Sequence, residues 1–126
     1  MIKARATFII LTLLLSLSAA GQTIEKVKAE LHRQGVPHAE IVLAQARLET
    51  GNFTSRRCKV DHNLFGMKKR KRYAKYRHWK ESVKDYKERI SSRYTGGNYY
   101  AFLKRIGYAE EREYTKKLQK IIRTSK

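Results

Sequence analysis

One carboxylate in this sequence stands where a proton-donating acid could work. Glu49 follows Leu48 at the end of a predicted amphipathic helix and precedes Gly51. The partial negative charge of a helix C-terminus and desolvation by apolar neighbours both favour the protonated carboxyl, whereas the many cations oppose it, so a tight cleft is required. A protonated carboxyl can supply the proton that the leaving oxygen of a glycosidic bond needs. Spacing alone leaves open that Glu49 is an ordinary surface residue.

The other residue types that commonly do chemistry form no convincing set. The four histidines contain no helical ligand pair and Cys58 is the only cysteine, so neither a metal site nor a cofactor is expected. Cys58 precedes His62 by four residues, but cysteine–histidine pairs in enzymes are brought together by the fold and need an orienting third group. A single cysteine also excludes an intrachain disulfide, so the core alone must stabilise the domain.

The elements that must position Glu49 are mostly helices. Residues 52–67 look irregular, and residues 68–77, with seven Lys or Arg in ten positions, predict a short exposed hairpin or a loop. The sequence therefore predicts a mainly α fold, with about five helices around one core and a small β-hairpin lobe. Apolar periodicity, caps and glycine stops predict five helices: from a cap at Thr23 to Gly35, from about Pro37 to Thr50, from about Trp79 to Ser92, from a cap at Asn98 to Gly107, and from about Glu110 to Arg123.

The first twenty residues have the composition of an export signal. Lys3 and Arg5 precede an apolar run at residues 8–15, and small residues follow up to Ala20. Residues 1–20 are therefore predicted to be a signal peptide, with an uncleaved anchor as the alternative, and residues 21–126 one domain. The apolar run is short for a membrane span, so we expect no span after cleavage and a monomer in the periplasm or outside the cell.

The formal charge of +18 predicts attraction to polyanions. Nucleic acid, anionic lipid and anionic cell-envelope polymers all qualify by charge. Export makes nucleic acid a poor candidate, and the basic–aromatic run at residues 68–77 would serve it only in a cytoplasmic protein. Anionic polymers of the cell envelope are the expected partners.

Four segments match the motifs of one family in the same order. Ala44–Gly51 reads AQARLETG, Asn63–Lys68 reads NLFGMK, Tyr76–Tyr86 reads YRHWKESVKDY, and Gly107–Ala109 reads GYA and is followed by Tyr114. These resemble the AQAxxESG, NLFGIK, YxSWxESIxDY and GYAxDxxY motifs of the bacterial glucosaminidases. That family (glycoside hydrolase family 73) contains lysozyme-like peptidoglycan hydrolases such as autolysins and the flagellar-rod hydrolase. The matching segments cover roughly residues 38–122.

The resemblance implies a lysozyme-like α+β fold and specific roles. Glu49 matches the general acid of the family, and Tyr108 and Tyr114 match its tail tyrosines, of which Tyr108 is the favoured active-site residue. The loop with Asn63 would form one wall of a sugar cleft. Five residues are expected to bind substrate on this basis: Gln45, Asn63, Phe65, Gly66 and Tyr76. Core packing is the alternative role for Phe65, Trp79 and Tyr86.

The sequence departs from the family pattern at the second catalytic group. Many relatives carry a longer β-lobe, often with a second acid, whereas residues 68–78 contain none here. Asp61, the N-acetyl group of the substrate, or a residue of another chain could fill that role. The expected reaction is cleavage of the β-1,4 bond after N-acetylglucosamine in peptidoglycan glycan strands. The alternative is a catalytically weak, cationic wall-binding module of the same fold.

Overall fold

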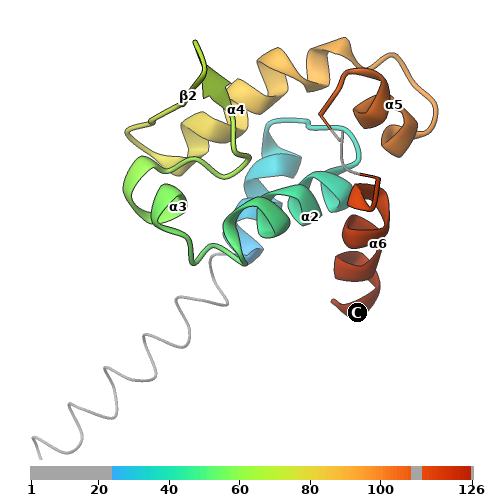
Figure 1. Ribbon diagram of the computed structural model, residues 1–126, viewed down its shortest axis with the longest axis horizontal. Helices are drawn as coiled ribbons and strands as arrows, with labels where there is room; N and C mark the ends of the chain where they lie inside the picture. Colours follow the sequence, from blue (N-terminus) through green and yellow to red (C-terminus); the bar gives the residue numbers. More distant parts are fainter. Residues whose placement is uncertain (1–23, 109–111, 126) are drawn as a thin grey trace, which may run out of the picture.

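The computed structural model describes residues 24–108 and 112–125, and the predicted signal peptide at residues 1–20 lies outside them. Within this part of the chain the fold is mainly helical with one two-stranded hairpin, which confirms the predicted fold class (Figure 1). After a helix at residues 24–33, the elements are α2 (Ala39–Thr50), α3 (Arg56–Asp61), β1 (Lys68–Lys69), β2 (Arg72–Tyr73), α4 (Trp79–Arg89), the 3-10 helix η1 (Ser91–Arg93), α5 (Tyr99–Arg105) and α6 (Tyr114–Thr124).

Helix α2 is the central element of the core. Three consecutive residues of α2, Ala44, Gln45 and Ala46, are buried, so neighbours cover this helix on more than one side. The small alanine side chains allow close approach, and α6 packs against α2. The remaining core comes from the other helices and the loops: Val27 and Leu31 before α2, Leu64 and Phe65 after α3, Val83 and Tyr86 of α4, Phe102 and Leu103 of α5, and Leu118 of α6.

Two predicted helix boundaries differ from the observed ones by two or three residues. Helix α2 begins at Ala39 rather than Pro37, because His38 adopts a left-handed φ of 51° that cannot continue a helix. Helix α4 ends at Arg89, and the chain tightens into η1 before the predicted end at Ser92. Helix α6 begins at Tyr114; the predicted cap at Thr23 and the predicted start at Glu110 both lie outside the described residues.

Helix α3 lies within the segment that was predicted to be irregular. None of its six residues is buried, so the sequence carries no apolar stripe there. Its local signal is Ser55, whose hydroxyl accepts a hydrogen bond from the Cys58 amide and caps the helix. Capping chemistry was therefore the only clue to this helix, and hydrophobic periodicity could not find it.

The predicted hairpin is present and short. Lys68 pairs with Tyr73 and Lys69 with Arg72 in antiparallel register, and all four side chains are exposed. The base of the hairpin is tied to the core by the buried Asn63 amide, whose Nδ2 donates to the Met67 carbonyl at 2.9 Å and the Ala74 carbonyl at 3.0 Å. One side chain thus holds both strands of the hairpin in place.

Candidate active site

Glu49 lies in the last turn of α2 against the loop that precedes the hairpin. Gly66 of that loop has a φ of +65°, and a Cβ atom at this position would lie 3.0 Å from Glu49 Oε2. The loop backbone therefore packs directly on the carboxyl group, which only glycine permits. The Glu49 side chain is nonetheless exposed, so the desolvation expected from its apolar neighbours is not found in the free protein.

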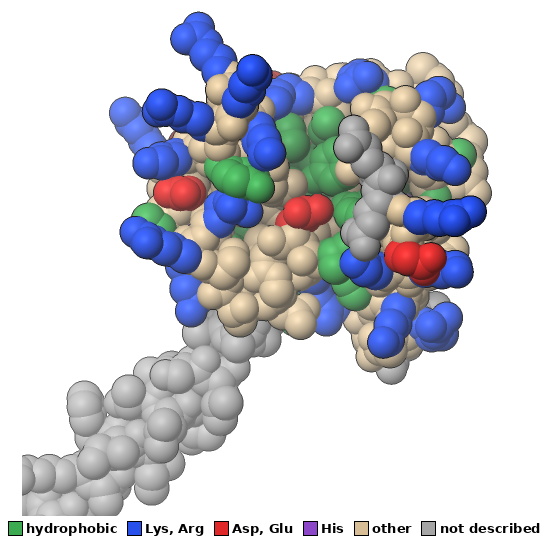
Figure 2. Space-filling view, in the orientation of Figure 1, with side chains coloured by type: hydrophobic (Ala, Val, Ile, Leu, Met, Phe, Trp, Pro, Cys, Tyr) green, Lys and Arg blue, Asp and Glu red, His purple; other side chains and the backbone are tan. Residues whose placement is uncertain are grey.

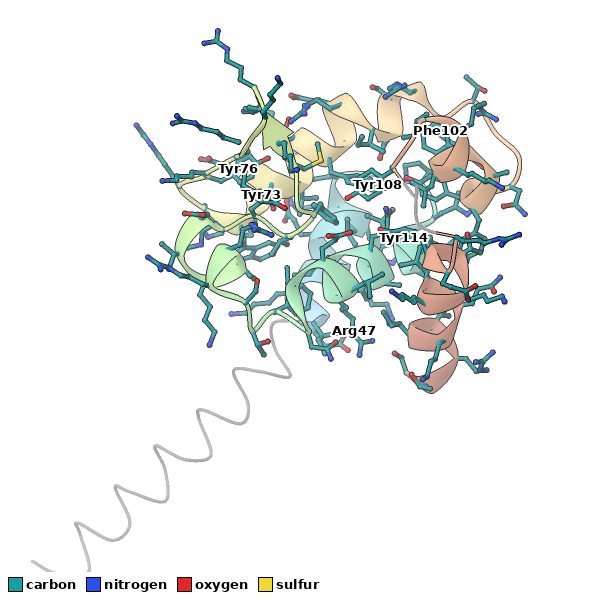
Figure 3. The ribbon with its side chains drawn as sticks, in the orientation of Figure 1. Arg47, Tyr73, Tyr76, Phe102, Tyr108 and Tyr114 are labelled. Atoms are coloured by element: carbon teal, nitrogen blue, oxygen red, sulfur yellow. The ribbon has the colours of Figure 1, made fainter. Side chains whose placement is uncertain are left out.

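Two tyrosines from the C-terminal third of the chain reach this position. The Tyr114 hydroxyl donates a long hydrogen bond of 3.4 Å to Glu49 Oε1, and the Tyr108 hydroxyl donates to the Phe65 carbonyl at 2.7 Å. The two rings lie 6.2 Å apart between centroids (Figure 3). The fold thus brings together Glu49, the Gly66 loop and both tail tyrosines.

A buried chain of hydrogen bonds leads from α5 to Glu49. The Tyr86 hydroxyl donates to Gln45 Oε1 at 2.6 Å, so the 2.6 Å contact between Tyr86 and Tyr99 must use the Tyr99 proton. Gln45 Nε2 donates to the Tyr114 hydroxyl at 3.3 Å, which leaves the Tyr114 proton for Glu49. Every proton in this network points toward the carboxylate. The network is buried except at its Glu49 end, so its members have little freedom to reorient.

The tyrosines of the site are donors and not bases at neutral pH. Burial raises the pKa of Tyr86 and Tyr108 well above the ordinary value, with the neighbouring tyrosines adding to the shift. Burial likewise raises the pKa of Tyr114, partly offset by the hydrogen bond from Gln45 and reinforced by the Glu49 carboxylate. These hydroxyls therefore keep their protons and can stabilise negative charge on an acceptor.

Three residues expected to bind substrate are buried and serve to position others. The Gln45 and Asn63 side chains are fully buried and Phe65 is 2% exposed, so none can contact a ligand through its side chain. Asn63 Oδ1 accepts from the Phe65 and Met67 amides and shapes the loop that lies on Glu49. Phe65 packs on Tyr86 at 4.6 Å between centroids, which agrees with the alternative of core packing.

Tyr76 and Asp61 lie at the hairpin base. The Tyr76 hydroxyl donates to Asp85 Oδ2 at 2.5 Å, and burial together with this bond raises the pKa of Tyr76. Asp85 also forms an ion pair with Arg89, so the Tyr76 hydroxyl is part of a hydrogen-bonded cluster with these two side chains. The Asp61 backbone carbonyl accepts from the Tyr76 amide, while its carboxylate accepts no hydrogen bond among the described residues. Its role as a catalytic base stays a prediction.

Other chemistry has little support in the described part of the chain. Cys58 is half-buried and unpaired in any disulfide, and burial raises the pKa of its thiol, which makes it a poor nucleophile. No group of three His, Cys, Asp or Glu side chains in residues 24–108 and 112–125 could hold a metal ion. In the same residues, no helix has the length and apolar character needed to cross a membrane.

The surface around this site has a distinct distribution of charge. Figure 2 shows hydrophobic side chains in the middle of the face seen in Figure 1, with Lys and Arg around the edges. The cations are most crowded on the side of the hairpin. A ligand lying on this face would therefore contact apolar surface at its centre and positive charge at its margin.

Comparison with known proteins gives one match. The family model for glucosaminidase, described as mannosyl-glycoprotein endo-beta-N-acetylglucosaminidase, matches residues 24–126. No curated protein sequence and no solved structure matches the chain.

Proposed function

The chain belongs to the glucosaminidase family of glycoside hydrolases, whose members act on peptidoglycan, and on this premise we propose that it cleaves β-1,4 bonds of the cell-wall glycan with Glu49 as general acid. The cut falls on the N-acetylglucosamine side of the strand. One observation carries the assignment: Glu49 is the carboxyl group on which the Gly66 loop and the Tyr114 hydroxyl converge.

The two carboxyl oxygens of Glu49 have different neighbours and therefore different proposed roles. Oε1 accepts from Tyr114, so the acid proton resides on Oε2, beside Gly66. A glycan strand laid over this exposed carboxyl would exclude water and thereby favour the protonated form before the reaction. Once Oε2 has given its proton to the leaving oxygen, the Tyr114 hydroxyl stabilises the resulting carboxylate through a charge-assisted hydrogen bond.

The second catalytic group determines the stereochemistry of the product. A water molecule activated by a carboxylate such as Asp61 gives inversion at the anomeric carbon, whereas attack by the N-acetyl group of the substrate gives net retention. The anomer released first therefore distinguishes activation of water from attack by the N-acetyl group. Action as a monomer stays part of this proposal. The predicted signal peptide and the charge of +18 support action in the periplasm or outside the cell.

The decisive experiment replaces Glu49 by glutamine and measures new reducing ends on purified peptidoglycan. Loss of a general acid lowers the rate by roughly 10²–10⁴-fold, while folding and wall binding should persist. Glu40→Gln is the matched control, because Glu40 is an exposed glutamate in the first turn of the same helix.

Full activity of Glu49→Gln would refute the assignment of the acid. The chemistry of the new ends tests the linkage: N-acetylglucosamine ends support this proposal, and N-acetylmuramic acid ends identify a muramidase. An absence of new ends with the native protein would indicate a wall-binding module.

A further inference from the structure

Helix α3 and the hairpin segment together form a surface of uncompensated positive charge, here called the cationic lobe. Its ten cations belong to residues 56–59 and 68–77, and all of them are exposed except Arg57, which is half-buried. None of the ten makes an ion pair with a described residue, whereas Arg33, Lys84, Arg89 and Lys116 elsewhere do. Carboxylates of the described residues therefore do not neutralise this charge. The cations are Arg56, Arg57, Lys59, Lys68, Lys69, Arg70, Lys71, Arg72, Lys75 and Arg77.

The hairpin turn carries two cations in an unfavourable backbone conformation. Arg70 and Lys71 are the two central residues of the turn, with φ of 50° and 67°. Positive φ at both positions is the signature of a type I′ turn, which favours Asn-Gly because these residues adopt left-handed backbone conformations at the lowest cost. Turn stability therefore does not explain Arg and Lys at the tip, and a partner for their charges would.

Side-chain contacts tie the parts of the cationic lobe to each other and to α4. The Arg57 guanidinium lies 3.2 Å from the centre of the Tyr73 ring, and Lys68 lies over the same ring at 4.9 Å, so α3 and the hairpin brace each other. Arg89 Nη2 donates to the Lys68 carbonyl at 2.8 Å, which fixes the first strand to α4. A charged surface fixed before binding loses less conformational entropy when it meets a ligand.

The cationic lobe adjoins the candidate acid. Strand β1 begins at Lys68, two residues after Gly66, which packs on Glu49. The buried Asn63 amide spans the same two features, since it bonds the Met67 and Ala74 carbonyls and shapes the Gly66 loop. A ligand that engages the lobe is thus held at a fixed distance from Glu49.

We propose that the cationic lobe binds the carboxylates of peptidoglycan stem peptides and makes peptide-bearing glycan the preferred substrate. This inference rests on the proposed function. Stem peptides are attached to the strand that is cut, so their carboxylates accompany the scissile bond to Glu49. Arginine at the tip and on α3 suits carboxylates because its planar fork binds them in pairs of hydrogen bonds.

The test compares two forms of the same glycan, with stem peptides and after their removal by an amidase. Electrostatic enrichment at a charged surface raises encounter by about 10-fold or more, so the native protein should show at least a tenfold higher kcat/KM on peptide-bearing strands at low salt. The advantage should shrink as ionic strength rises. The variant with Lys69, Arg70, Lys71 and Arg72 all changed to Gln should lose most of the preference and keep its rate on bare strands.

Two further variants separate docking from net charge and from hairpin structure. Changing Lys26, Lys28, Lys120 and Arg123 to Gln removes the same charge from exposed positions outside the lobe, and should leave the preference intact. Arg70→Asn with Lys71→Gly supplies the residues that the turn favours, so it should raise the melting temperature and still lower the preference. If Arg70 and Lys71 served only to stabilise the turn, this variant would have a lower melting temperature and would keep the preference for peptide-bearing strands.

Co-sedimentation with the two glycan forms keeps the inference testable apart from catalysis. The native protein should bind peptide-bearing walls more strongly, and the variant with Lys69, Arg70, Lys71 and Arg72 changed to Gln should lose this difference. That result would support binding of stem peptides by the cationic lobe even if Glu49→Gln leaves activity unchanged. Equal binding of the native protein to both forms would overturn the inference. Binding that follows wall-linked phosphate polymers, and not stem peptides, would also overturn it.

Discussion

Replacing Tyr86 by phenylalanine removes one buried oxygen atom from the centre of the tyrosine network. That oxygen donates to Gln45 Oε1 and accepts from Tyr99, both at 2.6 Å, and the Tyr86 side chain is fully buried. The substitution leaves two buried polar groups without these partners, at a cost of about 1–3 kcal/mol for each group. We therefore expect a loss of about 2–6 kcal/mol in the free energy of unfolding, a large share of the ~5–15 kcal/mol typical of a whole domain.

Urea unfolding measures this loss, with two matched Tyr→Phe controls. Tyr99→Phe removes only the donor at the start of the network, so it should cost less than Tyr86→Phe. Tyr73 is 41% exposed and its substitution should change stability by less than about 0.5 kcal/mol. Equal slopes of free energy against urea concentration would show that the denatured states are comparable.

The same substitution should weaken catalysis where the protein is still folded. Without Tyr86, the Gln45 amide is held less firmly, and the Tyr114 hydroxyl that it orients loses its fixed direction toward Glu49. We expect fewer new reducing ends per minute with little change in KM. A Tyr86→Phe protein as stable as the Tyr73→Phe protein would refute the network, as would a larger loss for Tyr99→Phe.

Two further predictions concern Gly66 and Glu30. Gly66→Ala places a methyl group 3.0 Å from Glu49 Oε2, so it should lower reducing-end formation more than tenfold. Gly35→Ala is the control, because Gly35 has a similar φ of +71° and open space around it. This control should lower the free energy of unfolding only by the backbone strain of about 1–2 kcal/mol. The hydrogen bond from Arg33 lowers the pKa of Glu30 from 4.5 to about 2. The ionised Glu30 therefore stabilises the folded state above pH 4.5, and this stabilisation is lost as pH falls toward 2. Glu30→Gln should therefore have a melting temperature that declines less than the native one across this interval, and parallel declines would contradict the assignment.

The sequence predicted those helices whose apolar residues recur at helical spacing. Val27 and Leu31, and Val83 and Tyr86, do so and lie in the core. Helix α3 has no buried residue, and His38 takes a left-handed conformation that the preceding proline does not reveal. Periodicity reports burial on one face of a helix, so it cannot detect an element that lacks such a face.

The proximity of Glu49 and Tyr114 in the candidate site could be expected only through the resemblance to the glucosaminidases. Glu49 and Tyr114 are 65 positions apart, and no local pattern specifies that the hydroxyl of one reaches the carboxylate of the other. The motifs also do not show which of their residues are buried and which face solvent. Gln45 and Asn63 are fully buried and support the candidate site from within the core. That distinction depends on packing between distant segments, which a linear motif does not contain.

The clamp formed by Asn63 has a consequence for how this fold can diversify. Because one buried amide closes the base of the hairpin by bonding the Met67 and Ala74 carbonyls, residues beyond that base do not support the Gly66 loop. Insertions at the tip can therefore lengthen the lobe without moving Glu49, the proposed acid. Specificity for a ligand can change by exchange of a short exposed module, while the candidate site behind the clamp stays the same.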